Sequence, residues 1–155
     1  MELVAEKIDW GNLVSESYYE TIWAIEERIK SFDNEEALIG LHFLYENMNK
    51  KDKREFRSFL ILLMSHILKW KYQPQKRTMS WRKTINYSRE EIEDKREDVP
   101  TLNENYIEEV WNKCFERAVR DAKFDMNISH KVNFNPEPLT WKEVFEDEYF
   151  LDDND

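Results

Sequence analysis

The chain has very little glycine, proline or cysteine. Its 155 residues include 2 glycines, 4 prolines and 1 cysteine. β-Sandwiches and β-barrels need turn residues at short intervals, so this composition argues against both. The single cysteine, Cys114, excludes a disulfide within one chain, and we expect it to be a small buried side chain rather than a nucleophile. The scarcity of glycine also excludes a glycine-rich phosphate-binding loop.

Long apolar runs are lacking as well. The longest, at residues 59–64, suits the core of a helix and falls far short of the about 18 residues that a membrane span needs. The N-terminal segment carries acids early and has no apolar stretch typical of a signal peptide. We therefore expect a cytoplasmic protein without a membrane segment.

Metal-ligand spacing is also missing. His42, His66 and His130 lie far apart in the sequence, and none belongs to a His-x-x-x-His or Glu-x-x-His pair. We therefore expect no metal site, no cofactor and no catalytic residue, and we predict that the protein is not an enzyme.

What the chain does have is charge and aromatic side chains. Charged residues make up 36% of the sequence and aromatic residues 14%, which is typical of helices with polar outer faces around a bulky core. The fold class we predict is all-α: a single-domain helical bundle over residues 1–155, with about five main helices and a short C-terminal helix. An N-terminal arm at 1–14 would pack through Leu3, Val4, Ile8 and Trp10, and residues 152–155 would form an acidic end.

Capping pairs and apolar stripes predict the individual helices. The first begins near Ser17, the second near Asp33, and a polar joint at 49–53 separates the second from a central third helix at 52–71. We expect a fourth helix at 81–96 capped by Ser80, a fifth at 103–125 with Thr101 paired to Glu104, and a last one that starts at Thr140, paired to Glu143. The apolar stripes of the first two helices, which we expect to be buried, consist of Tyr19, Ile22, Trp23, Ile25 and Ile29, and of Leu38, Leu41, His42, Tyr45 and Met48.

One stretch, residues 65–85, is strongly basic although the formal net charge of the chain is −10. This basic segment holds six lysines and arginines, no acid, and three interleaved aromatic residues. It could bind nucleic acid through phosphate contacts and base stacking, or bind an acidic protein. Its cations could instead pack within the fold over tryptophans and pair with carboxylates and helix ends, which is the interpretation we favour. The residues of the candidate ligand or partner surface are His66, Lys69, Lys76, Arg77, Trp81, Arg82 and Lys83.

His66 and Lys69 lie three residues apart on the predicted third helix, so both project to nearly one side. Such a pair could act as a base and an electrostatic clamp. The simpler interpretation, which we favour, is that His66 is a structural residue bonded to an acid of a neighbouring helix, such as Glu26 or Glu46. Trp70 and Trp81 flank the Gln73-Pro74 loop, and we expect both to be largely buried.

The segments HILKWKYQP at 66–74 and SWRKTI at 80–85 resemble the hallmark of the bacterial family called domain of unknown function 29. The run from Pro100 to Asn103 before a long helix, Trp141 near a last helix, and the closing Phe150-Leu151 fit the same family. The resemblance covers about residues 15–151. It implies a helical protein without an assigned activity, so it supports the fold and adds nothing on chemistry.

Two functional hypotheses follow. The first is a non-enzymatic helical module that binds a protein partner, such as an inhibitor or immunity-type factor, because the chain is acidic, rich in aromatics and without catalytic spacing. The alternative is a nucleic-acid-associated module that uses the basic segment, which the net negative charge disfavours. The sequence leaves open the identity of the partner and the oligomeric state, a homodimer included.

Overall fold

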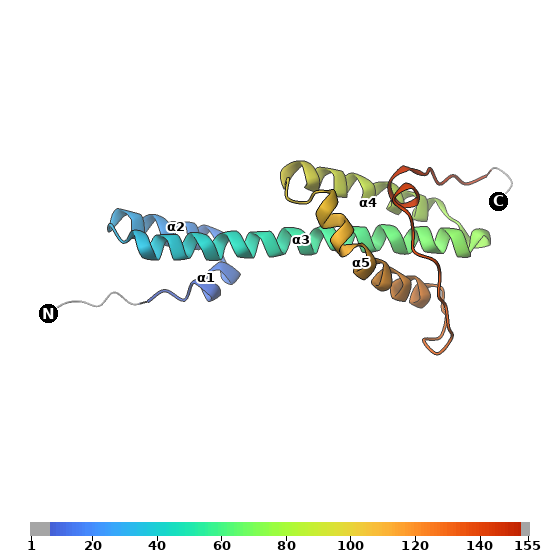
Figure 1. Ribbon diagram of the computed structural model, residues 1–155, viewed down its shortest axis with the longest axis horizontal. Helices are drawn as coiled ribbons and strands as arrows, with labels where there is room; N and C mark the ends of the chain where they lie inside the picture. Colours follow the sequence, from blue (N-terminus) through green and yellow to red (C-terminus); the bar gives the residue numbers. More distant parts are fainter. Residues whose placement is uncertain (1–6, 153–155) are drawn as a thin grey trace. The chain divides into compact units, whose positions relative to one another are not determined.

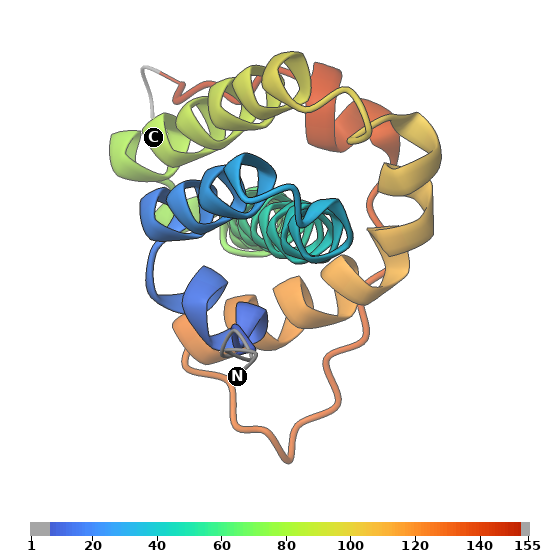
Figure 2. The ribbon, with the colours of Figure 1, turned by 90° about the vertical axis from the view of Figure 1, so that its left-hand side faces the viewer.

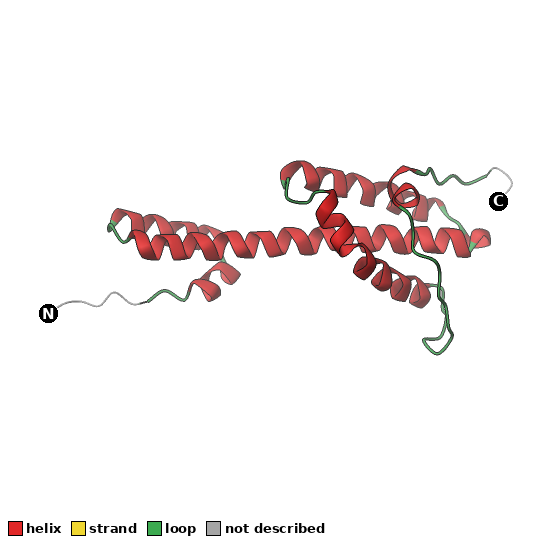
Figure 3. Cartoon of the chain, in the orientation of Figure 1, coloured by secondary structure: helices red, strands yellow, loops and turns green. Residues whose placement is uncertain are grey.

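Residues 7–152 are described by the structure, a computed structural model. Helices and loops account for this whole range, and no strand occurs in it (Figure 3). The all-α fold class predicted from the sequence is thus confirmed. The chain folds into two compact units, residues 1–52 and residues 53–155, whose boundary falls inside the longest helix. That the chain behaves as a single domain stays a prediction.

The first unit contains α1 (Trp10–Glu16), α2 (Tyr18–Lys30) and the beginning of α3 (Asn34–Tyr72). α2 starts where its cap predicts, since the Ser17 hydroxyl accepts from the Glu20 N–H at 3.2 Å. At the start of α3, the Asp33 carboxylate accepts from the Glu36 N–H at 3.4 Å. Of the predicted arm, Trp10 is buried and Ile8 is partly buried, whereas Leu3 and Val4 lie outside the described residues.

α2 runs antiparallel to the first part of α3 (Figure 1 and Figure 2). The Tyr18 hydroxyl donates to Asn47 Oδ1 at 2.8 Å near one end of the pair. Further along, Ile25 and Trp10 approach Gly40 so closely that a Cβ added there would lie 2.7 Å from the Trp10 ring and 2.8 Å from Ile25 Cγ1. Glycine at position 40 therefore lets α1 and α2 pack against α3.

The core of the first unit is small. Its main cluster consists of four buried side chains, Trp10, Ala24, Ile25 and Ala37, with three partly buried apolar residues packed on them, and Val14 is buried as well. Trp10 is fixed further by its indole N–H, which donates to Glu36 Oε1 at 2.7 Å. Two of the four buried side chains are alanines, so little apolar area is removed from water in this unit.

α3 continues from Asn34 to Tyr72 without interruption, so the predicted joint at residues 49–53 is wrong. That segment, NKKDK, is polar but contains neither proline nor glycine. Lysine is a good helix former, and polarity by itself does not end a helix. The helix ends where the sequence predicts, at the residues before Pro74.

The second unit contains the rest of α3, a 3₁₀ turn at Pro74–Lys76, α4 (Met79–Asp98), α5 (Glu104–Asp125) and a π-helical turn at Lys142–Glu146. α4 lies beside α3 and α5 crosses it (Figure 1). The core holds 19 buried side chains. Six of them come from α3 and are completely buried: Phe56, Leu60, Leu63, Met64, Ile67 and Leu68. The central place predicted for this helix is confirmed within the second unit.

Two predicted caps are off by a few residues. α4 is capped by Thr78 rather than Ser80, since the Thr78 hydroxyl accepts from the Trp81 N–H at 3.2 Å. α5 is capped by Asn103 rather than Thr101, since its amide oxygen accepts from the Tyr106 N–H at 3.0 Å. Several capping residues compete at each of these positions, and the loop geometry selects one.

The predicted capping box at the C-terminal turn is present. The Thr140 hydroxyl accepts from the Glu143 N–H at 3.2 Å, and the Glu143 carboxylate accepts from the Thr140 N–H at 3.1 Å. The turn buries Val144 and partly buries Trp141 and Phe145.

Candidate protein interface

His66 and Lys69 do lie together, in a partly buried cluster on the second unit. The Lys69 ammonium, on a residue only 6% exposed, donates to Asp125 Oδ2 at 3.2 Å. It lies 3.5 Å from His66 Nε2 and 5.1 Å from the centre of the Trp81 ring. His66 Nδ1 lies 2.9 Å from the Leu62 carbonyl oxygen, so Nδ1 carries the proton and Nε2 faces the ammonium.

This arrangement gives His66 a structural environment. Burial and the neighbouring Lys69 charge lower the pKa of the imidazole, which is therefore neutral near pH 7. The prediction that His66 bonds to an acid such as Glu26 or Glu46 is wrong. The ring bonds to its own helix, and the acid of the cluster, Asp125, comes from α5 and binds the lysine.

Most of the other cations of the basic segment are engaged within the second unit. Lys71 pairs with Glu143 at 2.6 Å. Arg77 donates to the Trp70 carbonyl at 2.8 Å and packs over the Trp70 ring. Arg82 donates to the Tyr149 carbonyl at 2.8 Å. Lys76 and Lys83 are exposed. The interpretation that the cations of this segment pair and pack within the fold thus holds for Lys69, Lys71, Arg77 and Arg82.

The two tryptophans of the segment differ in burial. Trp70 is buried, as predicted, and its ring meets Tyr149 edge-on at 5.9 Å. Trp81 is only partly buried, and the Lys69 ammonium lies over its ring. The cations and rings of this segment therefore hold α3, α4 and the C-terminal segment together.

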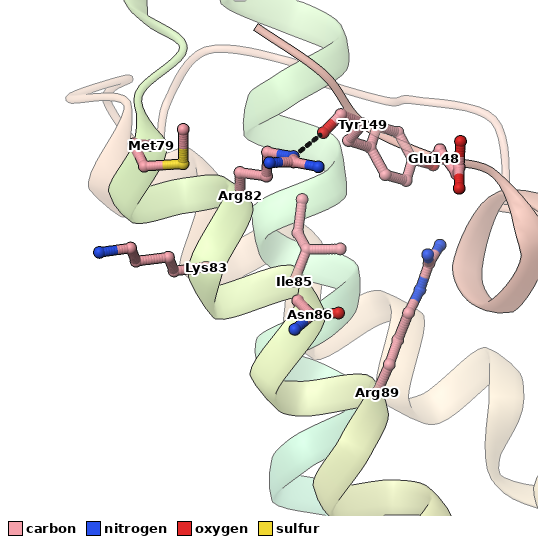
Figure 4. Close-up of a pocket in the computed structure, with 8 residues that line it drawn as sticks. All are labelled: Met79, Arg82, Lys83, Ile85, Asn86, Arg89, Glu148 and Tyr149. Carbon is pink, nitrogen blue, oxygen red and sulfur yellow. Dashed lines mark hydrogen bonds between the residues drawn. The ribbon is translucent and has the colours of Figure 1, made fainter.

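A cavity of about 400 Å³ lies between α4 and the C-terminal segment, lined among others by Arg82, Arg89 and Tyr149 (Figure 4). Arg89 donates to the backbone carbonyls of Val144 and Glu143, and burial lowers the pKa of its guanidinium. Burial also raises the pKa of Tyr149 to about 12. Both arginines are thus bonded to the C-terminal segment, and Lys83 extends away from them (Figure 4).

Other chemistry-bearing groups are buried or dispersed. Cys114 is buried, and burial raises the pKa of its thiol, in line with the sequence interpretation. Across residues 7–152, no group of three or more His, Cys, Asp or Glu side chains is placed to hold a metal ion. In that same range, no helix is both long and apolar enough to cross a membrane.

The most exposed apolar surface lies on the first unit. Of the seventeen large apolar side chains that are exposed among the described residues, eleven lie between positions 19 and 48. Two stripes at helical spacing account for most of them. We name them the hairpin stripes: Tyr19, Ile22, Trp23 and Ile29 on α2, and Leu38, Leu41, Tyr45 and Met48 on α3.

The periodicity of these stripes predicts that they are buried in the core, and this prediction is wrong. Tyr19 is 88% exposed, Trp23 64% and Leu38 65%, and His42 on the same face is exposed as well. Only Ile25 of the predicted first stripe is buried. Apart from Ile25, the buried face of this hairpin is made of small residues, among them Ala24, Ala37 and Gly40. The small residues were the signal that could have located the true packing face, because they let the helices approach closely.

The charge around the hairpin stripes is negative. Residues 17–48 contain seven acids and two bases. Glu26 lies within the α2 stripe, between Trp23 and Ile29, and is exposed. The exposed Glu20 and Glu35 add to the charge on α2 and at the start of α3. The hairpin therefore exposes large apolar side chains together with acids, and its net charge is negative.

Comparison with known proteins gives one family. The family model described as Domain of unknown function DUF29 matches residues 42–150. No curated protein and no solved structure matches the chain. The matched range includes the basic segment and nearly all of the second unit, while the α2 stripe lies before it. On this match, which covers more than half of its length, the chain belongs to the family Domain of unknown function DUF29.

Proposed function

We propose that this protein is a non-enzymatic helical module that binds another protein through the hairpin stripes of its first unit. One observation carries the proposal: among its described residues, a unit with five buried apolar side chains leaves eleven large apolar side chains exposed. Soluble monomeric proteins rarely expose a contiguous apolar patch of more than a few hundred Å², and larger patches mark interaction surfaces.

The free energy of burying apolar side chains favours a partner that covers the hairpin stripes. Burying a Leu, Ile, Met or Phe side chain is worth about 1.5–3 kcal/mol relative to leaving it in water. Aromatic residues such as Tyr19, Trp23 and Tyr45 contribute large contact areas and are enriched in the centres of protein interfaces. A partner that covers the stripes would supply the burial that the small core of the first unit lacks.

A nucleic-acid function has less support. Binding of phosphate needs exposed cations without internal partners. Lys69, Lys71, Arg77 and Arg82 are bonded within the second unit, which leaves Lys76 and Lys83 on an acidic chain. An acidic inhibitor that covers a basic protein is the form of the proposal that the net charge favours.

Site-specific photo-crosslinking in cells of the native host tests the proposal. A photoreactive side chain is placed at position 19, 38 or 45 on the hairpin stripes or, as a control matched to position 19, at position 124 on α5. Tyr19 is 88% exposed and Phe124 84%, so both report on an equally accessible aromatic position.

We expect a discrete crosslinked protein from position 19 and none from position 124. Leu41→Ser, elsewhere on the stripes, should weaken that adduct without changing the far-ultraviolet circular dichroism spectrum. An absence of adducts at positions 19, 38 and 45, or equal adducts from position 124, would contradict the proposal. The mass of the adduct separates a second copy of this chain from a different protein.

A further inference from the structure

From the charge and periodicity of the hairpin stripes, we infer that the partner contributes a basic amphipathic helix, which lies along the stripes with its apolar face down and its cations against the surrounding acids. The inference rests on the proposed function and specifies the chemistry of the partner. It commits to another protein, rather than to a second copy of this chain, a lipid surface or a nucleic acid.

The shape of the surface fits a helix. Each stripe repeats at steps of three, four or seven residues on one face of its helix, which is the pattern that a partner helix reads. The α2 stripe runs from Tyr19 to Ile29, and at about 1.5 Å per residue it is about 15 Å long. Since α2 and this part of α3 run antiparallel, the two stripes extend over the same stretch of the hairpin. An added helix would give the first unit the larger apolar core of a helical bundle.

The charge selects the kind of helix. Glu26 lies inside the α2 stripe, so an apolar partner must leave this carboxylate near water or pair it with a cation. Glu20 and Glu35 are exposed in the same unit. Basic residues flanking the apolar stripe of the partner would satisfy these carboxylates and speed association.

The net negative charge of the hairpin disfavours a second copy, a lipid surface and a nucleic acid as occupants. A second copy would bring together two hairpins whose residues 17–48 each hold seven acids and two bases, and like net charges across an interface are repulsive. Anionic lipid surfaces and nucleic acids attract basic segments, and this surface is acidic. A basic amphipathic helix is thus the occupant that complements both the apolar stripes and the acids.

Designed peptides provide the probe. The first is an amphipathic helix of about 18 residues, with leucine on one face and lysine elsewhere, long enough to span the α2 stripe. The second has the same composition, with leucines scattered around the helix. The third keeps the leucine face and replaces every lysine by glutamate. Binding to the full chain is measured by titration calorimetry at physiological salt, and the mass of the free chain by light scattering.

Two pairs of variants of the full chain separate the apolar and electrostatic contributions. Trp23→Ser and Phe124→Ser both remove an exposed aromatic side chain, on the stripe and on α5, and leave the net charge unchanged. Glu26→Lys and Glu116→Lys both reverse one exposed acid, within the stripe and on α5, and change the net charge equally. Non-specific attraction of a basic peptide to an acidic protein would therefore affect the members of each pair alike.

We expect the leucine–lysine helix to bind at least about tenfold tighter than the scrambled and the leucine–glutamate peptides. Trp23→Ser should weaken binding by about tenfold or more, and Phe124→Ser by less than about twofold. Glu26→Lys should weaken it by about three- to tenfold, and Glu116→Lys by less than about twofold.

The outcomes separate the inference from the proposed function. Equal binding of the lysine and glutamate helices, or a free chain that is a dimer dissociated by Trp23→Ser, would overturn the basic-helix inference and leave the interaction surface standing. Peptide binding that no stripe variant weakens would also overturn the inference. A monomer that binds none of the peptides, combined with no crosslink from position 19, would overturn the proposed function itself.

Discussion

In the second unit, apolar side chains that recur at helical spacing are buried, whereas in the first unit side chains with the same pattern are exposed. Phe56, Leu60 and Leu63 on α3 are completely covered by α4, α5 and the C-terminal segment. Leu38, Leu41 and Tyr45, on the same helix about three to five turns before Phe56, are about half exposed or more. Periodicity thus identifies a face that can be buried, and the number of neighbouring elements decides whether it is.

The two units also differ in how their polar groups are used. In the second unit, Lys69, Arg82 and Arg89 bond to a carboxylate or to backbone carbonyls and join segments far apart in the sequence. In the first unit, three of the seven acids in residues 17–48 are exposed, namely Glu20, Glu26 and Glu35. The second unit therefore uses its charges internally, and the first presents them at its surface.

The largest effect on stability is expected from Leu63→Ala in the second unit. Leu63 is completely buried among α3, α4 and α5 side chains, so truncation removes apolar contacts and leaves a cavity. We expect a loss of roughly 2–5 kcal/mol in the free energy of unfolding, measured by urea denaturation. A loss below about 1 kcal/mol would show that this core is not closed.

Gly40→Ala should destabilise the first unit. The added Cβ would lie 2.7 Å from the Trp10 ring, and overpacking of this kind costs about 1–3 kcal/mol. That cost exceeds the about 1 kcal/mol by which alanine favours a helix over glycine. Gly11→Ala is the control, because its Cβ would lie at an ordinary 3.6 Å from Phe43. A lower thermal unfolding temperature for Gly11→Ala than for Gly40→Ala would contradict this packing.

His66 should make the second unit less stable on mild acidification. Burial and Lys69 lower the pKa of His66 in the folded state below the ordinary value of 6.5. The unfolded chain therefore binds the proton first, so stability falls as the pH drops through 6.5 toward the lower folded-state pKa. His66→Asn, which cannot titrate there, should reduce this pH dependence in urea unfolding between pH 7.5 and 5.5. An unchanged slope in the variant would rule out this contribution.

The smallest effect on stability is expected from Trp23→Ser. Trp23 is 64% exposed, so its removal should change the free energy of unfolding by no more than about 0.5 kcal/mol. The same variant is expected to lose most of the peptide affinity. A large destabilisation, measured by urea unfolding, would mean that Trp23 belongs to the core as the sequence first suggested.

Much of the second unit could be predicted from the sequence. The face of α5 that carries Ile107, Cys114 and Ala118, and the box between Thr140 and Glu143, follow from spacing and local hydrogen bonding alone. The carbonyl acceptors of Arg82 and Arg89 could not be predicted, because backbone oxygens leave no mark in the sequence.

The candidate interface was harder to predict for a different reason. Trp23 and Leu38 look like core residues in any window of sequence, and a stripe meant for a partner has the same pattern as one meant for the core. The closely packed face of the hairpin is made of Ala24, Ala37 and Gly40, which contribute little to an apolar pattern.

Hydrogen exchange of the full chain, with and without the leucine–lysine helix, tests most directly whether the first unit is incomplete without its partner. Amides with few buried contacts around them exchange at low free energies of opening. We predict that residues 18–30 exchange at least about 100-fold faster than residues 104–125 in the free chain, and that the peptide slows the former and leaves the latter unchanged. Equal protection of the two segments in the free chain, or a peptide effect confined to residues 104–125, would contradict the account.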